Sequence, residues 1–170
     1  IAFYGGNFLG LPEADIRFLL AEASRFRDQG LTDGIRFSTR PDTVHPRTLA
    51  ILRDFPVSAV EIGVQSMSDA VLTASGRGHT AQDTVNAAGL LREAGCQLGM
   101  QMMVGLPGDD TAGALDTARR IAGLSPDFVR IYPTVVLAGT PLAVHFEQGT
   151  YRPLPLDLCV SLVARLWRIF

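Results

Sequence analysis

The chain has 170 residues, 47% of them hydrophobic, and its 15 basic and 17 acidic residues give a formal net charge of −2. This length and apolar content suit one domain with a sizeable core. The charges form no run that would indicate a general nucleic-acid or membrane surface, and no apolar run approaches the roughly 20 residues of a membrane span, so we expect a reduced, cytoplasmic setting.

Five short apolar runs recur along the chain at intervals of about 30 residues, which is typical of successive βα units. They predict strands at residues 1–4, 35–38, 59–64, 98–104 and 128–132. Because the runs are almost continuously apolar, we expect parallel strands that are covered on both faces. Helical spacing of apolar residues predicts helices at 12–28, 46–55, 80–94 and 111–123.

The alternation of strands and helices predicts an α/β fold with a parallel sheet. A closed eight-fold barrel needs about 250 residues, so five units form only an arc of one. No GxGxxG or Walker loop follows the first run, which removes the main support for a doubly wound nucleotide-binding sheet. The first run has no preceding turn and the last residues continue an apolar helical pattern, so we expect a piece of a longer barrel.

Glycine and polar residues follow the first two runs. Gly5 and Gly6 would let a ligand approach bare backbone, since no Cβ stands in the way, although a tight strand-to-helix turn explains them equally well. Ser38 ends the second run, and Pro41 restricts Arg40 to extended backbone.

Gln65 ends the third run, and a buried strand seldom carries a polar amide there unless something binds to it. Sheets and barrels of this class bind ligands at the carboxyl ends of their strands. Arg77 follows in the next loop, before a helix amino terminus, and its planar fork of donors matches a carboxylate. A solvated loop arginine is the alternative, but the shared position with Gln65 favours ligand binding. We expect His79 to be a structural hydrogen-bond donor rather than a base.

The fourth run contains Gln101, which needs partners if it is buried, because an unpaired amide costs about 1–3 kcal/mol. A bound ribose or a neighbouring backbone group would supply them. Cys96 and Cys159 lie far apart without other metal ligands at a suitable spacing, so we interpret both as packing residues. No residue stands out as a catalytic acid or base.

With these motifs in this order, the chain resembles the radical S-adenosylmethionine superfamily. Within it, the resemblance is to the group around the catalytic subunit of the elongator complex, with oxygen-independent coproporphyrinogen oxidases somewhat further away. The shared motifs are FYGGNF at 3–8, STRPD at 38–42, EIGVQS at 61–66, GRGHT at 76–80 and MMVGLPGD at 102–109.

The resemblance implies a partial, TIM-like (β/α)6 barrel of which strand 1 and helix 1 are missing. Residues 1–150 would form strands two to six of this barrel, and residues 151–170 would begin a C-terminal helical extension. It also implies an enzyme that binds S-adenosylmethionine and a 4Fe-4S cluster and generates a 5′-deoxyadenosyl radical. By analogy with the elongator group, its partner would be transfer RNA or another substrate engaged by regions outside this piece.

Carried over motif by motif, the resemblance also implies the residues that bind S-adenosylmethionine. Gly5 and Gly6 would meet its methionine amino group, and Arg77 its carboxylate. Gln65 and Gln101 would lie by the carboxylate and ribose, and Ser38 near the ribose. The adenine would contact Met103 and Val135.

Three departures from the family pattern qualify this prediction. The cluster-binding CxxxCxxC motif is absent, and it would precede Ile1 in the family, so this piece alone is expected to be inactive. Relatives often have glutamate at Ser38 and aspartate at Gln101, so both exchanges remove a charge near the ribose. The alternatives are a coproporphyrinogen-oxidase-like enzyme, a non-catalytic barrel scaffold, and a generic phosphate-binding barrel in which Gln65 and Arg77 would point apart.

Overall fold

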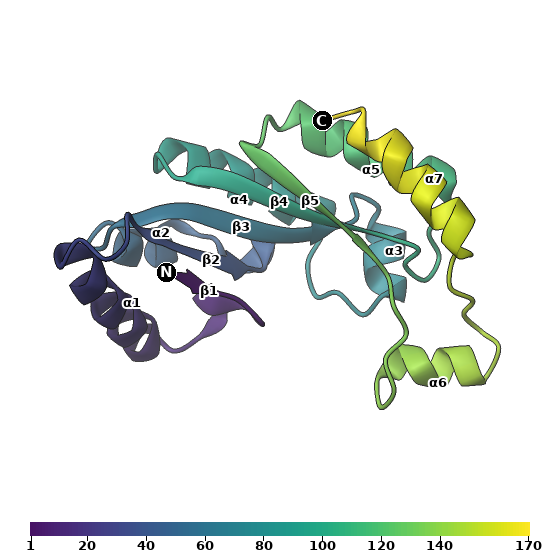
Figure 1. Cartoon of the computed structure of the whole chain (residues 1–170), viewed down its shortest axis with the longest axis horizontal. Coiled ribbons are helices and arrows are strands. Elements are labelled where there is room, and N and C mark those ends of the chain that lie inside the picture. The colour runs from purple at the N-terminus through teal and green to yellow at the C-terminus, as the bar shows by residue number, and fades with distance from the viewer.

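The computed structural model describes all residues 1–170. Five parallel strands form one sheet, and their order across the sheet, β1-β2-β3-β4-β5, is the same as their order along the chain (Figure 1). The strands are β1 (Ala2–Phe3), β2 (Ile35–Thr39), β3 (Val57–Gln65), β4 (Gln97–Val104) and β5 (Phe128–Pro133). The helices are α1 (Glu13–Asp28), α2 (Pro46–Leu52), α3 (Asp69–Ala74), α4 (Ala81–Glu93), α5 (Thr111–Gly123), α6 (Pro141–Glu147) and α7 (Leu156–Trp167), with short 3-10 turns η1 (Phe8–Gly10) and η2 (Pro41–Thr43). This unreversed strand order confirms the predicted arc of a parallel barrel.

All five predicted strands are present, and the helices expected between them are confirmed as α1, α2, α4 and α5. α2 is shorter than predicted and ends at Leu52. α4 begins as its sequence indicates, because Thr80 and Asp83 form a reciprocal capping box: the Thr80 hydroxyl accepts from the Asp83 amide at 3.2 Å, and the Asp83 carboxylate accepts from the Thr80 amide at 2.7 Å. Neither α3 nor α6 was predicted.

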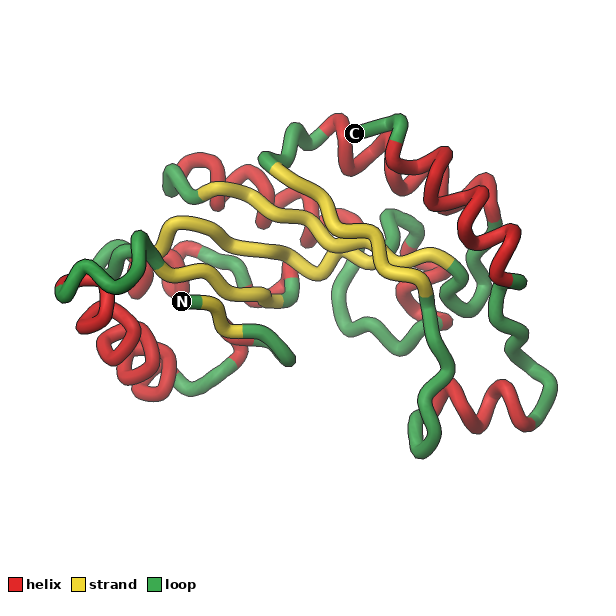
Figure 2. Tube along the Cα trace, viewed as in Figure 1, coloured by secondary structure: helices red, strands yellow, loops and turns green.

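The apolar core lies between the helices and one face of the sheet. Alternate strand residues such as Phe37, Ile62 and Met100 point into it and are fully buried. They meet the inward stripes of α1, α2, α4 and α5, and α7 packs beside α5. Figure 2 shows the strands as a curved layer joined by these helices. Each large apolar side chain buried here contributes about 1.5–3 kcal/mol.

The other face of the sheet is polar and, apart from Glu61, partly exposed, so the apolar cover expected on both faces is found on one face only. Arg36, Glu61, Gln101 and Arg130 occupy the positions that alternate with the core residues. In Figure 1, α3 and α6 lie near the carboxyl ends of the strands. None of the helices combines the length and the apolar character that a membrane crossing would need.

Candidate functional site

A polar cavity of about 650 Å³ lies at the carboxyl ends of the strands. All five strands or the loops that directly follow them contribute to its wall, as does the loop between α3 and α4. Its volume is within the range of small-molecule sites, which is about 300–1,000 Å³.

Six of the eight residues predicted to bind a ligand line this one cavity, although they come from five separate segments: Gly5, Gly6, Ser38, Gln65, Arg77 and Gln101. Met103 and Val135 lie in a neighbouring cavity of about 500 Å³, which shares Gly76 and Arg77 with the first. Gln65 and Arg77 therefore do not point apart, which argues against the generic phosphate-binding barrel. The individual binding roles stay predictions.

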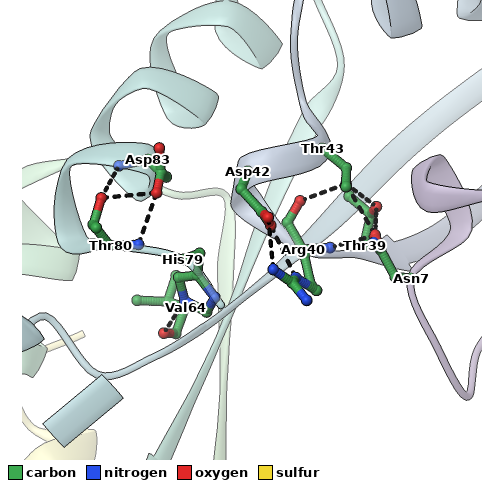
Figure 3. A network of polar contacts seen from close by, with 9 residues as sticks. All are labelled: Asn7, Thr39, Arg40, Asp42, Thr43, Val64, His79, Thr80 and Asp83. Atoms are coloured by element: carbon green, nitrogen blue, oxygen red, sulfur yellow. Dashed lines mark hydrogen bonds and ion pairs between the residues drawn. The ribbon is translucent and has the colours of Figure 1, made fainter. Parts of the chain in front are cut away.

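Asn7 joins the tips of the first two strands (Figure 3). Its side-chain oxygen accepts hydrogen bonds from the Thr39 hydroxyl at 2.7 Å, the Thr43 hydroxyl at 2.9 Å and the Arg40 backbone amide at 3.0 Å. This fixes the glycine pair beside it, where Gly5 adopts a φ of 99° and an added Cβ would meet nothing within 4 Å. Backbone is thus held open to the cavity.

Gln65 is buried at 8% exposure and has a φ of 64°, in the left-handed region that non-glycine residues rarely adopt. Its amide nitrogen lies over Gly63, where an added Cβ would approach it to 2.8 Å. Its side-chain oxygen is buried without a hydrogen-bond partner in the chain. An orphaned buried acceptor beside a cavity is the kind of group that a bound donor would satisfy.

Arg77 makes no ion pair, and its guanidinium donates only to the Met103 sulfur, at 3.3 Å. Desolvation, and then the charge of Arg40, lower the pKa of Arg77. Arg40 differs, because Asp42 binds its guanidinium at 2.9 and 2.6 Å. Gly78 leaves room for the Arg40 guanidinium, since a Cβ added at Gly78 would lie 2.5 Å from Nη2 of Arg40. An uncompensated cation at the cavity wall favours an anionic ligand group.

Glu61, which was not predicted as a site residue, is a fully buried carboxylate beneath the cavity. One oxygen accepts from the Tyr4 hydroxyl at 2.6 Å and Arg36 at 2.5 Å; the other accepts from Arg130 at 2.8 Å and the Gln101 amide at 3.0 Å. Burial alone raises the pKa of Glu61, but these hydrogen bonds together hold that pKa below its ordinary value. Gln101 therefore already has one partner within the chain, a carboxylate that accepts from its amide nitrogen, and its contact with a ribose stays a prediction.

The two cysteines lie apart from the cavity, Cys159 in the core and Cys96 packed against it. Burial raises the pKa of the Cys96 thiol. No group of three or more His, Cys, Asp or Glu side chains is arranged to hold a metal ion. The residues of this chain therefore do not fit an iron–sulfur cluster, whereas the polar cavity presents a guanidinium without an ion pair and a buried amide oxygen without a partner to a small polar ligand.

Comparison with sequence families shows that the profile of the Radical SAM superfamily matches residues 1–121, and that of the Radical_SAM C-terminal domain matches residues 126–170. A tRNA uridine(34) acetyltransferase of Dehalococcoides mccartyi is 34% identical over 134 residues, which cover 77% of this chain and 29% of that protein. Elongator complex protein 3 of Homo sapiens is 30% identical over 183 residues, which cover 95% of this chain and 33% of that protein. The chain thus spans a third or less of the length of these relatives.

Two solved structures share the fold. Elp3 of the archaeon Methanocaldococcus infernus, with an N-terminal deletion, superposes with a TM-score of 0.84 at 23% identity, covering 98% of this chain and 44% of that one. Coproporphyrinogen III oxidase (HemN) from Escherichia coli superposes with a TM-score of 0.71 at 22% identity, covering 99% and 40%.

Proposed function

Because the chain belongs to the radical S-adenosylmethionine superfamily, we propose that its cavity binds S-adenosylmethionine as part of an elongator-like, tRNA-modifying enzyme. The observation that carries this proposal is a pair of groups at one cavity: the buried oxygen of Gln65, which has no hydrogen-bond partner, and the exposed guanidinium of Arg77, which forms no ion pair. A zwitterionic amino acid joined to a nucleoside offers donors for the first and a carboxylate for the second.

The two adjoining cavities suit the two ends of such a ligand. Arg77 stands between them, so the methionine end would occupy the polar cavity with its carboxylate on Arg77. The backbone at Gly5 and Gly6 would receive the amino group. The adenine would lie in the second cavity, against Met103 and Val135.

The ribose would lie between Gln65, Gln101 and Ser38. The nitrogen of Gln101 already donates to Glu61, so its oxygen is the atom that would accept from a ribose hydroxyl. Ser38 and Gln101 are uncharged, so this part of the site would recognise hydroxyl groups through neutral hydrogen bonds.

With an electron supplied by an iron–sulfur cluster, S-adenosylmethionine would supply hydrogen-atom abstraction, and the residues of this chain would bind it, orient it and exclude water. The cluster ligands would lie outside residues 1–170. We extend the proposal to a partial barrel over residues 1–150 followed by a helical extension from residue 151, in a cytoplasmic enzyme. The curated relatives at 30–34% identity, one named as a tRNA-modifying enzyme and one as an elongator protein, favour transfer RNA over a porphyrinogen as the substrate.

Isothermal titration calorimetry with S-adenosylmethionine tests the proposal. We expect saturable binding at one site, and about tenfold weaker binding of decarboxylated S-adenosylmethionine, because the charge-assisted hydrogen bonds to Arg77 are lost. Inorganic phosphate serves as the control for a phosphate-binding barrel. Saturable binding of phosphate without binding of S-adenosylmethionine would contradict the proposal.

Gly63→Ala tests the position of the Gln65 amide. The added Cβ would lie 2.8 Å from the Gln65 nitrogen, the far end of a flexible side chain, so the amide moves while the strand does not. We expect binding of S-adenosylmethionine to weaken about fivefold, as for the loss of one neutral hydrogen bond, with little change in melting temperature. Gly89→Ala is the matched control, because a Cβ at Gly89 meets nothing within 4 Å. Unchanged binding in Gly63→Ala would exclude Gln65 from the site.

A further inference from the structure

The end of β3 contains a strained turn centred on Gln65. The Ser66 amide donates to the Val64 carbonyl at 2.8 Å, two residues back, and Gln65 has a φ of 64°. This is the positive-φ form of the γ-turn, which is the rare and strained one. Such strain persists only where the surrounding structure holds it in place.

His79 makes a second hydrogen bond to the same carbonyl. Its Nε2 lies 3.1 Å from the Val64 oxygen, and the side chain is buried at 6% exposure (Figure 3). Because a carbonyl only accepts, Nε2 carries the proton, and Nδ1 is left buried without a partner. A ring committed in this way to the backbone is not free to act as a base at Nε2.

His79 belongs to the loop that carries Arg77. That loop is anchored at its far end, where the Thr80 capping box starts α4 and the Asp69 carboxylate accepts from the Ala81 amide at 2.8 Å. No other hydrogen bond joins residues 75–80 to β3. The bond from His79 to Val64 therefore connects the segment of Arg77 to the turn of Gln65.

We propose that His79 is a positioning residue: its bond to Val64 holds the strained turn, and so keeps the Gln65 amide and the Arg77 guanidinium facing one cavity. The consequence for cofactor binding rests on the proposed function, whereas the effect on the turn does not. The sequence predicts only a structural hydrogen-bond donor at this position. The structure identifies the acceptor of this hydrogen bond as the Val64 carbonyl, which directly precedes Gln65.

The test compares His79→Phe, which keeps the ring but removes the donor, with His79→Gln, whose amide nitrogen replaces Nε2. Crystal structures of both give the φ of Gln65 directly. We expect Gln65 to leave the left-handed region in His79→Phe and to keep it in His79→Gln. Should His79→Phe fail to fold, His79→Asn, whose amide is too short to reach Val64, takes its place. A left-handed Gln65 in the donor-free variant would overturn the proposal, whether or not the chain binds S-adenosylmethionine.

Calorimetric titration with S-adenosylmethionine supplies the second readout. We expect about tenfold weaker binding for His79→Phe and near-normal binding for His79→Gln, with Gln82→Ala, an exposed change three residues further on, as the control. In a Gln65→Ala background, His79→Phe should weaken binding less, because the part of its effect that passes through Gln65 is already lost. Full additivity of the two changes would overturn the positioning role. If the unmodified chain does not bind S-adenosylmethionine but the φ of Gln65 changes as expected in His79→Phe, only the proposed function is refuted.

Discussion

Replacement of Arg77 by methionine is expected to weaken binding of S-adenosylmethionine by about 10- to 100-fold. Hydrogen bonds to charged groups contribute about 1.5–3 kcal/mol, and 1.4 kcal/mol corresponds to a factor of ten. The Arg77 guanidinium has no carboxylate partner in the chain, and desolvation together with the charge of Arg40 lowers its pKa. A ligand carboxylate would provide the guanidinium with the ion pair that it lacks. We therefore expect Arg77→Met to affect ligand binding more than stability.

Calorimetric titration measures the effect of Arg77→Met, and two further variants define its cause. Arg77→Lys keeps the charge but not the planar fork, so we expect an intermediate affinity. Arg25→Met removes an exposed arginine on α1, which pairs with Glu22, and should leave binding unchanged. An Arg77→Met chain that binds as tightly as the unmodified one would remove Arg77 from the site.

Glu61→Gln is expected to reduce the free energy of unfolding by about 2–3 kcal/mol. Breaking a buried ion pair typically costs about 3–5 kcal/mol, but the side chains of Arg36 and Arg130 are 36% and 41% exposed and would recover part of their hydration. Urea denaturation at neutral pH measures the change. Glu22→Gln is the control, because its exposed pair with Arg25 should contribute less than about 1 kcal/mol. Equal stabilities of the two variants would show that the Glu61 cluster does not stabilise the fold.

The same carboxylate predicts how stability depends on pH. The pKa of Glu61 is lower in the folded chain than its ordinary value of 4.5, so its contribution is fully present above about pH 4.5 and is lost as the pH falls through the folded value. The stability difference between the unmodified chain and Glu61→Gln should therefore shrink on acidification. A difference that stays constant from neutral pH down to pH 3 would contradict this assignment.

Most of the fold follows from local sequence patterns. The strands are short apolar runs, and α4 and α5 have side-chain caps at Thr80 and Asp110 that the sequence displays. α3 and α6, of six and seven residues, are too short for a periodic apolar pattern to reveal them. Their N-cap residues are Ser68 and Thr140, and these two residues are the sequence signals that would have indicated the two helices.

The candidate site was predictable where a residue ends a strand, and obscure where it depends on pairing between strands. Gln65 and Arg77 were recognisable from their positions, because parallel strands end at one edge. Glu61 lies inside the apolar run of β3, and its partners Arg36 and Arg130 are on β2 and β5, one and two strands away. Only the strand register brings these charges together. A charged residue inside three of the five apolar runs, at Arg36, Glu61 and Arg130, is the signal that would have indicated the cluster.

A crystal structure of the chain with bound S-adenosylmethionine tests the central claim most directly. We predict that the methionine carboxylate lies within hydrogen-bond distance of the Arg77 guanidinium, that Gln65 faces the ligand, and that the adenine contacts Met103. Density for the ligand at the amino ends of the strands, or against the outer helices with the carboxyl-end cavity filled only by solvent, would contradict the account.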